Sequence, residues 1–430
     1  MPIAPPAETT RRRIGFRWII LALICVGTTI NYINRLVIGI LAPDLQALYH
    51  ITDSQYGYIT AAFSFTYAFG QLGCGKLLDR IGTRLGYSLA LAGWSIAAML
   101  TALGNGAMSF GIFRAILGVT EAPGYPAAAK VCAEWFPRRQ RAFAFGFVNA
   151  GCNMSAIIAA LLVPWLKIHY GWQATFIAIG AMGLILLAVW IPLYKSPQVH
   201  PLLDASELAL IESDPPESTR RLPWREVLRY RQSWVFVVGK FLTDAMWWFF
   251  MSFIPKILHG PPFNLDLAHV GIPLVAIYFM ADLGSVGGGW MSSSMIHRGF
   301  TVNFARKSTM LFMAMLVLPM MMLPSVSTSL AAILILGLAT AGHQGFSSNN
   351  YTLCSDLFPK SMVGVISGLG GFFGYIGASI FTAFTGNWVQ AKGNYVAPCI
   401  IASSAYLISI LAIHLVSPRL TPVTIVDEDH

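Results

Sequence analysis

Twelve stretches of about 20 mostly apolar residues run through the chain, and they limit its fold more than any other feature. Each stretch is long enough to cross the hydrocarbon core of a bilayer as an α-helix. Only 11% of the residues are charged and 56% are hydrophobic, so a soluble fold could not cover its surface with polar groups. We therefore predict an all-helical, polytopic membrane protein that has lipid as its main solvent.

The predicted spans form two sets of six, which suggests two pseudo-symmetric bundles. The first set covers residues 18–41, 56–77, 85–104, 108–131, 142–165 and 172–193. The second set covers residues 233–257, 268–293, 307–324, 328–354, 362–387 and 394–416. The predicted division is an N-terminal tail (1–17), a first bundle (18–194), a linker (195–232), a second bundle (233–417) and a C-terminal tail (418–430).

The first span is interpreted as a retained helix and not as a cleaved signal peptide. It contains Asn31, Asn34 and Arg35, and no small-residue cleavage site follows it. Lysine and arginine gather in one set of loops, around residues 11–17, 76–84, 130–141, 195–231, 298–307, 360 and 419. The opposite set of loops holds only Lys167, Lys256 and Lys392. Because cytoplasmic loops are enriched in these residues, both termini are predicted to be cytoplasmic.

The six cysteines are scattered and show no C-x-x-C spacing, which is typical of small core residues. We therefore expect no disulfide, no metal site and no cofactor apart from a coupling proton. The net charge of +9 is spread over loops and does not form the basic and aromatic surface of a nucleic-acid binder. Nucleic acid is accordingly not an expected partner.

A few ionisable side chains fall inside the predicted spans, where a charge costs at least about 2.5–3.5 kcal/mol. They are Arg35, Arg114, Glu121, Lys240, Asp244, Asp282 and His343. This cost makes each of them a candidate functional residue. The alternative for Asp244 and Asp282 is pairing with Lys240 or capping a broken helix. The alternative for His343 is a core histidine with a satisfied hydrogen bond.

Arg35, Arg114 and Glu121 suggest a site for a carboxylate. Arg114 and Glu121 are seven residues apart, so they share one helix face at a separation of about 10 Å. Two arginines that face one cavity can hold a carboxylate through bidentate hydrogen bonds. Burial favours the protonated form of Glu121 and a nearby arginine favours the charged form, so substrate on the arginine would release Glu121 to take a proton. The alternative is a structural Arg–Glu pair that locks helices together.

The loop after the second predicted span carries a motif. It reads Gly75-Lys76-Leu77-Leu78-Asp79-Arg80-Ile81-Gly82-Thr83-Arg84. This sequence resembles the G-x-x-x-D-R-x-G-x-R signature of the major facilitator superfamily, and it lies in the expected loop. The resemblance implies a transporter of two six-helix bundles whose conformation at the cytoplasmic face depends on Gly75, Asp79, Arg80, Gly82 and Arg84. The alternative is a generic basic loop.

Further stretches resemble the anion:cation symporter family within that superfamily. In the first half they are residues 31–35 (NYINR), 113–122 (FRAILGVTEA) and 135–137 (WFP). In the second half they are residues 240–247 (KFLTDAMW), 281–289 (ADLGSVGGG), 342–344 (GHQ), 348–351 (SNNY) and 355–359 (SDLFP). Together they look most like the hexuronate transporters of the bacterial inner membrane, which take up glucuronate and galacturonate.

This resemblance implies a substrate site between the two halves. Its first half would supply Tyr32, Arg35, Tyr67 and Arg114, and its second half would supply Trp247, Gln344, Ser348, Asn349 and Tyr351. Asn34, Lys240, Asp244, Asp282 and His343 are secondary polar candidates. Family members often place an aspartate where Asn34 stands, and this departure favours Glu121 as the main proton carrier. For Trp247 and Tyr67 the alternative is an ordinary contact with the core or with lipid.

We therefore predict a proton-coupled symporter that imports a sugar-acid anion, such as glucuronate or galacturonate, by alternating access. Alternative substrates are an aldonate such as galactonate, or an aromatic or dicarboxylic acid. A proton-coupled exporter is a further alternative, although residues 146–164 lack the glycine- and proline-rich run typical of exporters. No nucleophile–base set or phosphate loop indicates an enzyme. The expected partners are a small organic anion, a proton and the lipid bilayer, and the protein is expected to be a monomer.

Overall fold

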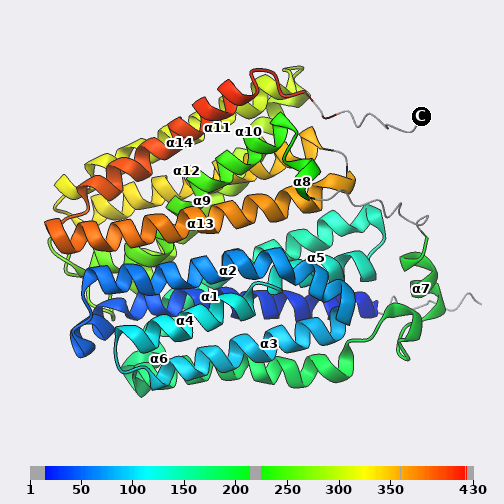
Figure 1. Ribbon diagram of the computed structural model, residues 1–430, viewed down its shortest axis with the longest axis horizontal. Coiled ribbons are helices and arrows are strands. Elements are labelled where there is room, and N and C mark those ends of the chain that lie inside the picture. Colours follow the sequence, from blue (N-terminus) through cyan, green and yellow to red (C-terminus); the bar gives the residue numbers. More distant parts are fainter. Residues whose placement is uncertain (1–14, 214–223, 359, 422, 424–430) are drawn as a thin grey trace, which may run out of the picture.

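The computed structural model describes residues 15–213, 224–358, 360–421 and 423 (Figure 1). Most of the two predicted tails and part of the predicted linker, residues 214–223, lie outside the described residues. Over the described ranges the chain consists of α-helices and short 3₁₀ turns, without a β-strand. The predicted all-helical fold is therefore confirmed.

Two groups of long helices account for most of the chain. The first group is α1 (Phe16–Tyr49), α2 (Asp53–Ile81), α3 (Thr83–Leu100), α4 (Ala107–Glu121), α5 (Gly124–Trp135) and α6 (Arg138–Leu193). The second group is α9 (Arg231–His259), α10 (Gly271–His297), α11 (Val302–Val317), α12 (Ser329–Leu357), α13 (Lys360–Lys392) and α14 (Val396–Val416). The short helices α7 (Ala205–Ile211) and α8 (Trp224–Val227) lie between the two groups in the sequence.

These helices make twelve spans, although nine stretches of the described residues are long and apolar enough to cross a membrane by themselves. One of the nine is α6, which bends at Gly171 (φ 86°) and supplies the fifth and sixth spans. The fourth span is broken into α4 and α5 at Pro123, because proline has no N–H to continue the helix ladder. The remaining span, α2, contains many polar residues and is less apolar than these nine.

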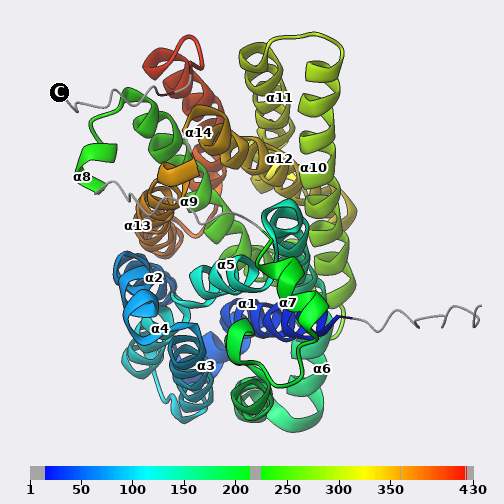
Figure 2. The ribbon, with the colours of Figure 1, turned by 90° about the vertical axis from the view of Figure 1, so that its right-hand side faces the viewer.

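The two groups pack side by side as two halves (Figure 2). Within each half the helices contact one another extensively, as α1 and α6 or α2 and α4 do in the first half. Between the halves, α2 contacts α13 and α6 contacts α10. In each interface the second span of one half meets the fifth span of the other. The second spans are α2 and α10, and the fifth spans are the first part of α6 and α13. The two interfaces are therefore related by the expected pseudo-two-fold symmetry.

The long helices lie roughly along one axis, so the molecule has two distinct ends (Figure 1). We call the end that carries α7 and α8 the linker end, and the end with the turns at 50–52, 260–270 and 393–395 the distal end. Near the distal end, a Cβ on Gly57 of α2 would lie 2.9 Å from the Cα of Gly386 of α13. Glycine at both positions therefore lets the two halves approach closely there.

Candidate functional site

Arg35 is the centre of the candidate site. It lies midway along α1, is only 4% exposed, and its guanidinium donates to oxygens from four residues. Its Nε donates to Glu121 Oε2 of α4 at 2.8 Å. Its terminal nitrogens donate to Tyr375 Oη of α13 at 2.9 Å, Asn31 Oδ1 at 2.7 Å and Tyr67 Oη at 3.1 Å. One charged oxygen and three neutral oxygens therefore surround the guanidinium.

Glu121 neutralises Arg35 from the last residue of α4, where Pro123 interrupts the fourth span. Its side chain is fully buried, and its second oxygen, Oε1, has no hydrogen-bond partner among the described residues. Breaking such a buried pair leaves an uncompensated charge, which costs several kcal/mol. An acid group that accepts a proton when its arginine is taken by another anion would avoid this cost.

Aromatic rings surround the Arg35 guanidinium. Its carbon lies 4.3 Å from the ring centroid of Tyr32 and 4.6 Å from that of Tyr67. Tyr67 in turn lies against Tyr375, with ring centroids 4.1 Å apart. These faces favour a cation and exclude water, which strengthens every charged contact in the cluster. Tyr32 and Tyr67 therefore lie beside Arg35, where the resemblance placed them.

Arg114 has different partners from those that its spacing suggested. A structural pair of Glu121 with Arg114 was the alternative to a binding site, but Glu121 pairs with Arg35 instead. The terminal nitrogens of Arg114 donate to the backbone carbonyls of Asn34 and Arg35, each at 3.2 Å, and its guanidinium lies 4.6 Å from the ring of Phe63. Arg114 therefore holds α4 against the middle of α1, directly behind Arg35.

A second buried ion pair lies in the other half. Lys240 Nζ is 2.6 Å from Asp244 Oδ2, one turn further along α9, and it donates to Tyr351 Oη of α12 at 2.9 Å. Next to this pair, Trp247 stacks on His343, with ring centroids 4.7 Å apart and planes 10° from parallel. His343 Nδ1 shares a hydrogen bond with Tyr406 Oη of α14 at 2.8 Å. Five of the predicted residues thus form one cluster at the contact of α9 and α12.

Other predicted residues lie apart from these two clusters. Asn349 is fully buried and donates to the carbonyls of Gly288 and Gly345, so it joins α12 to α10. Ser348 bonds to Gly345 and reaches towards Ser285 of α10. The side chains of Gln344 and Asp282 are half-buried and have no hydrogen bond or ion pair within the described ranges.

Asn34 lies beside Arg35, but its side-chain amide nitrogen has no partner in the part of the chain that the structure describes. Tyr375 is the functional candidate that the sequence reasoning missed. It belongs to α13 of the second half, and its hydroxyl provides a direct link from that half to Arg35. The only local signal for Tyr375 in the sequence is that it follows Gly370, Gly371 and Gly374. These glycines let α13 pack closely against its neighbours.

The motif loop lies at the linker end, between α2 and α3. Asp79 pairs with Lys130 of α5 at 2.9 Å, and Arg84 donates to the carbonyl of Ile191 of α6 at 2.7 Å. Gly82 has φ 80°, a left-handed conformation that makes the turn between the helices. Gly75 and Arg80 are exposed. The motif therefore connects the linker ends of several helices within the first half.

Hydrogen bonds between the two halves gather between Arg35 and the distal end. Asp53 of α2 forms an ion pair with Lys256 of α9, and its N–H donates to Gln390 of α13 at 2.9 Å. Tyr56 Oη donates to the carbonyl of Ser252 at 2.7 Å, and Ser379 Oγ donates to the carbonyl of Ala61 at 3.0 Å. These contacts close the distal end.

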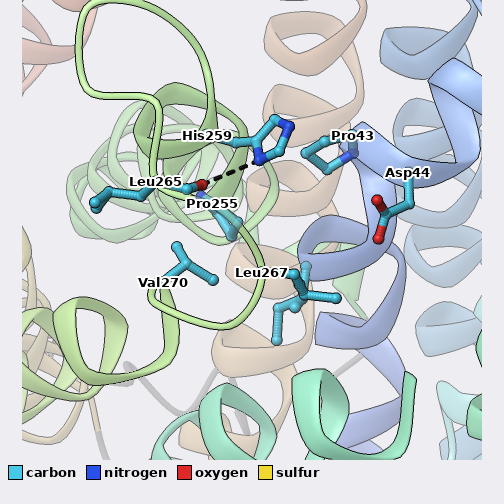
Figure 3. A pocket seen from close by; sticks show the side chains of 8 residues that line it. Pro43, Asp44, Pro255, His259, Leu265, Leu267 and Val270 are labelled. Carbon is cyan, nitrogen blue, oxygen red and sulfur yellow. Dashed lines mark hydrogen bonds between the residues drawn. The ribbon is translucent and has the colours of Figure 1, made fainter. Parts of the chain in front are cut away.

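A shallow pocket lies near the same end, between α1, α9 and the turn that follows α9 (Figure 3). Pro43, Asp44, Pro255 and His259 are among the residues that line it. His259 Nδ1 shares a hydrogen bond with the carbonyl of Leu265 at 3.0 Å, and Asp44 is paired with Lys167 at 2.7 Å. The polar groups of the pocket are thus occupied, and it contains none of the predicted site residues.

Comparison with known proteins identifies the class to which this fold and site belong. The family model of the Major Facilitator Superfamily matches residues 24–382, so the chain belongs to that superfamily. A bacterial homologue of the human lysosomal transporter Spinster, solved in an inward-facing and unoccupied conformation, has a TM-score of 0.71 at 17% identity. That match covers 94% of this chain and 96% of the other. It supports the twelve-span fold. The superfamily and the relatives described next are transporters, so the protein is not an enzyme.

The sequence is also similar to that of particular transporters. A hexuronate transporter of Escherichia coli K12 is 30% identical over 390 residues, which cover 89% of this chain and 90% of that protein. A galacturonate transporter of Dickeya chrysanthemi is 32% identical over 67% of this chain and 85% of its own length. A D-galactonate transporter of Escherichia coli O6:H1 is 27% identical over 90% and 92%. The resemblance to hexuronate transporters that the motifs indicated is therefore confirmed.

Proposed function

We propose that the protein imports a sugar-acid anion, such as glucuronate or galacturonate, together with a proton by alternating access. The observation that carries the proposal is the environment of Arg35. A buried guanidinium that is held by one carboxylate and three neutral oxygens can exchange these partners for a substrate carboxylate without becoming an isolated charge. Hydroxyl and amide groups nearby suit the hydroxyls of a sugar acid.

The relatives support this class of substrate. They are named as transporters of hexuronate, galacturonate and D-galactonate, and each of these anions carries one carboxylate on a chain of hydroxyls. Arg35 is the group in this protein that would bind that carboxylate. The D-galactonate relative keeps aldonates as a second substrate candidate.

Proton coupling would follow from the Arg35–Glu121 pair. The pair is neutral when no substrate is bound. If a substrate carboxylate takes the place of Glu121 on Arg35, the released Glu121 is a buried, unpaired anion unless it takes a proton. Substrate and proton would then bind together, and the charge of the site would not change. The residue directly before Arg35 in the sequence is Asn34 and not an acid, so it offers no second proton site.

Alternating access would use the two halves, residues 18–194 and 233–417, with the segment 195–232 between them. The hydrogen bonds around Asp53 and Lys256 hold the distal end closed in this conformation. Basic residues such as Lys76, Arg84 and Arg231 lie at the linker end, which supports a cytoplasmic position for that end in a bacterial inner membrane. The conformation would then be one that is closed to the outside.

Uptake into proteoliposomes tests the proposed function. The purified protein should accumulate labelled galacturonate when the outside is acidic, and an ionophore that collapses the proton gradient should abolish the accumulation. Liposomes without protein are the control. The proposal would be disproved if the gradient drives no accumulation of galacturonate, glucuronate or D-galactonate.

The variant Glu121→Gln tests the coupling site. Glutamine keeps the size and the hydrogen-bonding oxygen but cannot exchange a proton. We expect the variant to lose gradient-driven accumulation and to keep counterflow exchange within about ten-fold of the wild-type rate, as expected for the loss of one charge-assisted hydrogen bond. Accumulation that survives in this variant would show that Glu121 is not the coupling site.

A further inference from the structure

Three exposed arginines gather at the linker end, where α8 leads into α9. Arg225 belongs to α8, Arg229 lies in the turn after it, and Arg231 is the first residue of α9. Neither Arg225 nor Arg229 has an ion pair or a hydrogen bond within the described ranges, and the exposed acid between them, Glu226, pairs with neither. We call the three residues the arginine cluster. Its uncompensated positive charge favours an anionic ligand.

Several other cations at the linker end are already engaged within the protein. Lys130 pairs with Asp79 at 2.9 Å, and Arg306 pairs with Asp356 at 3.0 Å. Lys307 Nζ donates to two backbone carbonyls just after α14, at 2.7 and 2.9 Å. The arginine cluster therefore differs from these basic residues, because two of its three charges have no partner in the part of the chain that the structure describes.

The turn that carries Arg229 lies at the depth of the lipid headgroups. Trp234, on the first turn of α9, is 42% exposed, and its ring lies 6.4 Å from that of Phe373 of α13. Its indole N–H donates to the carbonyl of Leu228, the residue before Arg229, at 3.0 Å. An exposed tryptophan on a spanning helix, with its N–H satisfied, is typical of the membrane–water interface. This hydrogen bond therefore fixes Arg229 at that interface.

The other two arginines are held at the same level. Arg231 donates to the carbonyl of Leu415 at 2.9 Å, near the end of α14, where the Leu415 side chain is 64% exposed. Val227 of α8 is fully buried, and its carbonyl accepts a hydrogen bond from Ser233 Oγ of α9. The helix α8 also contacts α13 and lies at the outer edge of the second half (Figure 2). The buried side of α8 is thus attached to the bundle, and Arg225 remains exposed.

The surroundings of the cluster suit a phospholipid phosphate better than a soluble anion. Arginine can donate two parallel N–H groups to a phosphate. Two exposed aromatic side chains, Trp224 (50%) and Trp234 (42%), lie beside the arginines. A free phosphate ion would leave these rings in water, whereas the glycerol and acyl chains of a lipid would cover them. A zwitterionic headgroup adds an ammonium group that the cluster repels, so an anionic headgroup fits best.

We propose that the arginine cluster binds the headgroup of an anionic phospholipid, and that Trp234 contacts the glycerol and acyl chains of the same lipid. The inference is independent of the proposed transport function, because none of these residues belongs to the candidate site. The bound lipid holds α8, the last part of the linker, at the membrane surface and against the second half.

Native mass spectrometry of the purified full-length protein tests the inference. The probes are phosphatidylglycerol and phosphatidylcholine with identical acyl chains, and the dissociation constant of the first bound lipid is measured for each. Each basic residue close to an anionic headgroup changes the affinity about five-fold. The wild-type protein should therefore bind phosphatidylglycerol at least about ten-fold more tightly than phosphatidylcholine. A large molar excess of inorganic phosphate should not displace the phosphatidylglycerol.

A double variant and a matched control locate the site. Arg225→Gln with Arg229→Gln should weaken phosphatidylglycerol binding at least about ten-fold and change phosphatidylcholine binding at most about two-fold. Both side chains are exposed, so the variant should remain folded, and size-exclusion chromatography checks this. Arg225→Lys with Arg229→Lys keeps both charges and should keep the preference for phosphatidylglycerol. The control, Lys195→Gln with Arg298→Gln, removes the same charge elsewhere at the linker end, and it should change phosphatidylglycerol binding at most about two-fold.

Four results would overturn the inference. Equal binding of the two lipids would show that the charge of the headgroup is not recognised. Full affinity for phosphatidylglycerol in the folded Arg225→Gln, Arg229→Gln variant would place the lipid elsewhere. An equal loss in the Lys195→Gln, Arg298→Gln control would show that binding follows only the net charge of the protein. Displacement of phosphatidylglycerol by inorganic phosphate would make the cluster a site for a soluble anion. Each result leaves the proposed function intact, since the uptake assay tests that function separately.

Discussion

The two halves of the molecule each hold one buried ion pair, but the pairs are built differently. Arg35 and Glu121 belong to α1 and α4, so their contact joins two helices. Lys240 and Asp244 are one turn apart on α9, and their contact is local to that helix. The first pair therefore depends on how its half is packed, whereas the second would survive most movements of its neighbours.

The two cations also differ in their links to the opposite half. Arg35 donates through its planar fork to four residues, one of which, Tyr375, comes from the second half. Lys240 donates to Asp244 and Tyr351, and both belong to its own half. Charge alone therefore does not rank the two sites. The number and direction of the donors make Arg35 the group on which both halves converge.

The largest expected effect comes from replacing Arg35. Arg35→Lys keeps the charge but removes the fork, and an ammonium group with three donors cannot satisfy Glu121, Tyr375, Asn31 and Tyr67 together. Disrupting a buried pair of this kind costs about 3–5 kcal/mol, which corresponds to a loss of more than about 100-fold in counterflow of galacturonate. Initial rates in proteoliposomes measure it.

The matched variant in the other half is Lys240→Gln. Since its partners are local to one half, we expect counterflow of galacturonate to fall by no more than about ten-fold, the worth of one charge-assisted hydrogen bond. Size-exclusion chromatography shows whether each variant remains folded. Equal losses for Arg35→Lys and Lys240→Gln, with both proteins folded, would remove the distinction between the halves.

The effect of Tyr375→Phe is expected to be smaller than that of Arg35→Lys, because it removes only the link from the second half to Arg35. The guanidinium then loses one neutral acceptor, at a cost of about 1.5–3 kcal/mol. We expect the thermal midpoint of the ligand-free protein to fall by a few degrees, at about 1–2 °C for each kcal/mol in a chain of 430 residues. Galacturonate should restore more stability to this variant than to the wild type, because its carboxylate can replace the missing acceptor.

Tyr278→Phe is the control for that variant. Tyr278 is also a buried tyrosine, on α10, but its hydroxyl has no hydrogen-bond partner among the described residues. Removing this hydroxyl should therefore leave the midpoint almost unchanged or raise it slightly. If Tyr375→Phe and Tyr278→Phe behave alike, the link between Arg35 and the second half contributes nothing measurable.

The sequence was sufficient to predict the fold and the location of the buried charges. Each span is a local property, since about 20 apolar residues in a row identify it without any tertiary information. Arg35, Glu121, Lys240 and Asp244 stand out for the same reason, because each is a charge in an apolar stretch. The structure adds their partners.

Pairing between helices could not be predicted in the same way. The seven-residue spacing placed Glu121 on the face of Arg114, but the packing of α1 against α4 gives Glu121 to Arg35. Tyr375 was missed because aromatic residues are common in every span, and only the contact of α2 with α13 shows which one meets Arg35. Asn349 has the polarity expected of a binding residue, yet its helix face turns to α10, and a single sequence does not specify that rotation.

The smallest expected effect concerns an ion pair that lies between the halves and not within one. Asp53 and Lys256 are partly exposed, with 28% and 15% of their side chains accessible, so their attraction should be worth about 1 kcal/mol. Asp53→Asn should then raise the labelling rate of a cysteine introduced at Ser252 about five-fold in detergent, because the distal end opens more often.

The same protein without the cysteine at Ser252 corrects for the native thiols. Adding Lys256→Gln should have little further effect, since either substitution already removes the shared contact. Additive effects of the two substitutions would mean that the pair does not hold the distal end closed. The Asp53–Lys256 pair would then have no role in closing the distal end that sets it apart from the buried ion pairs within each half.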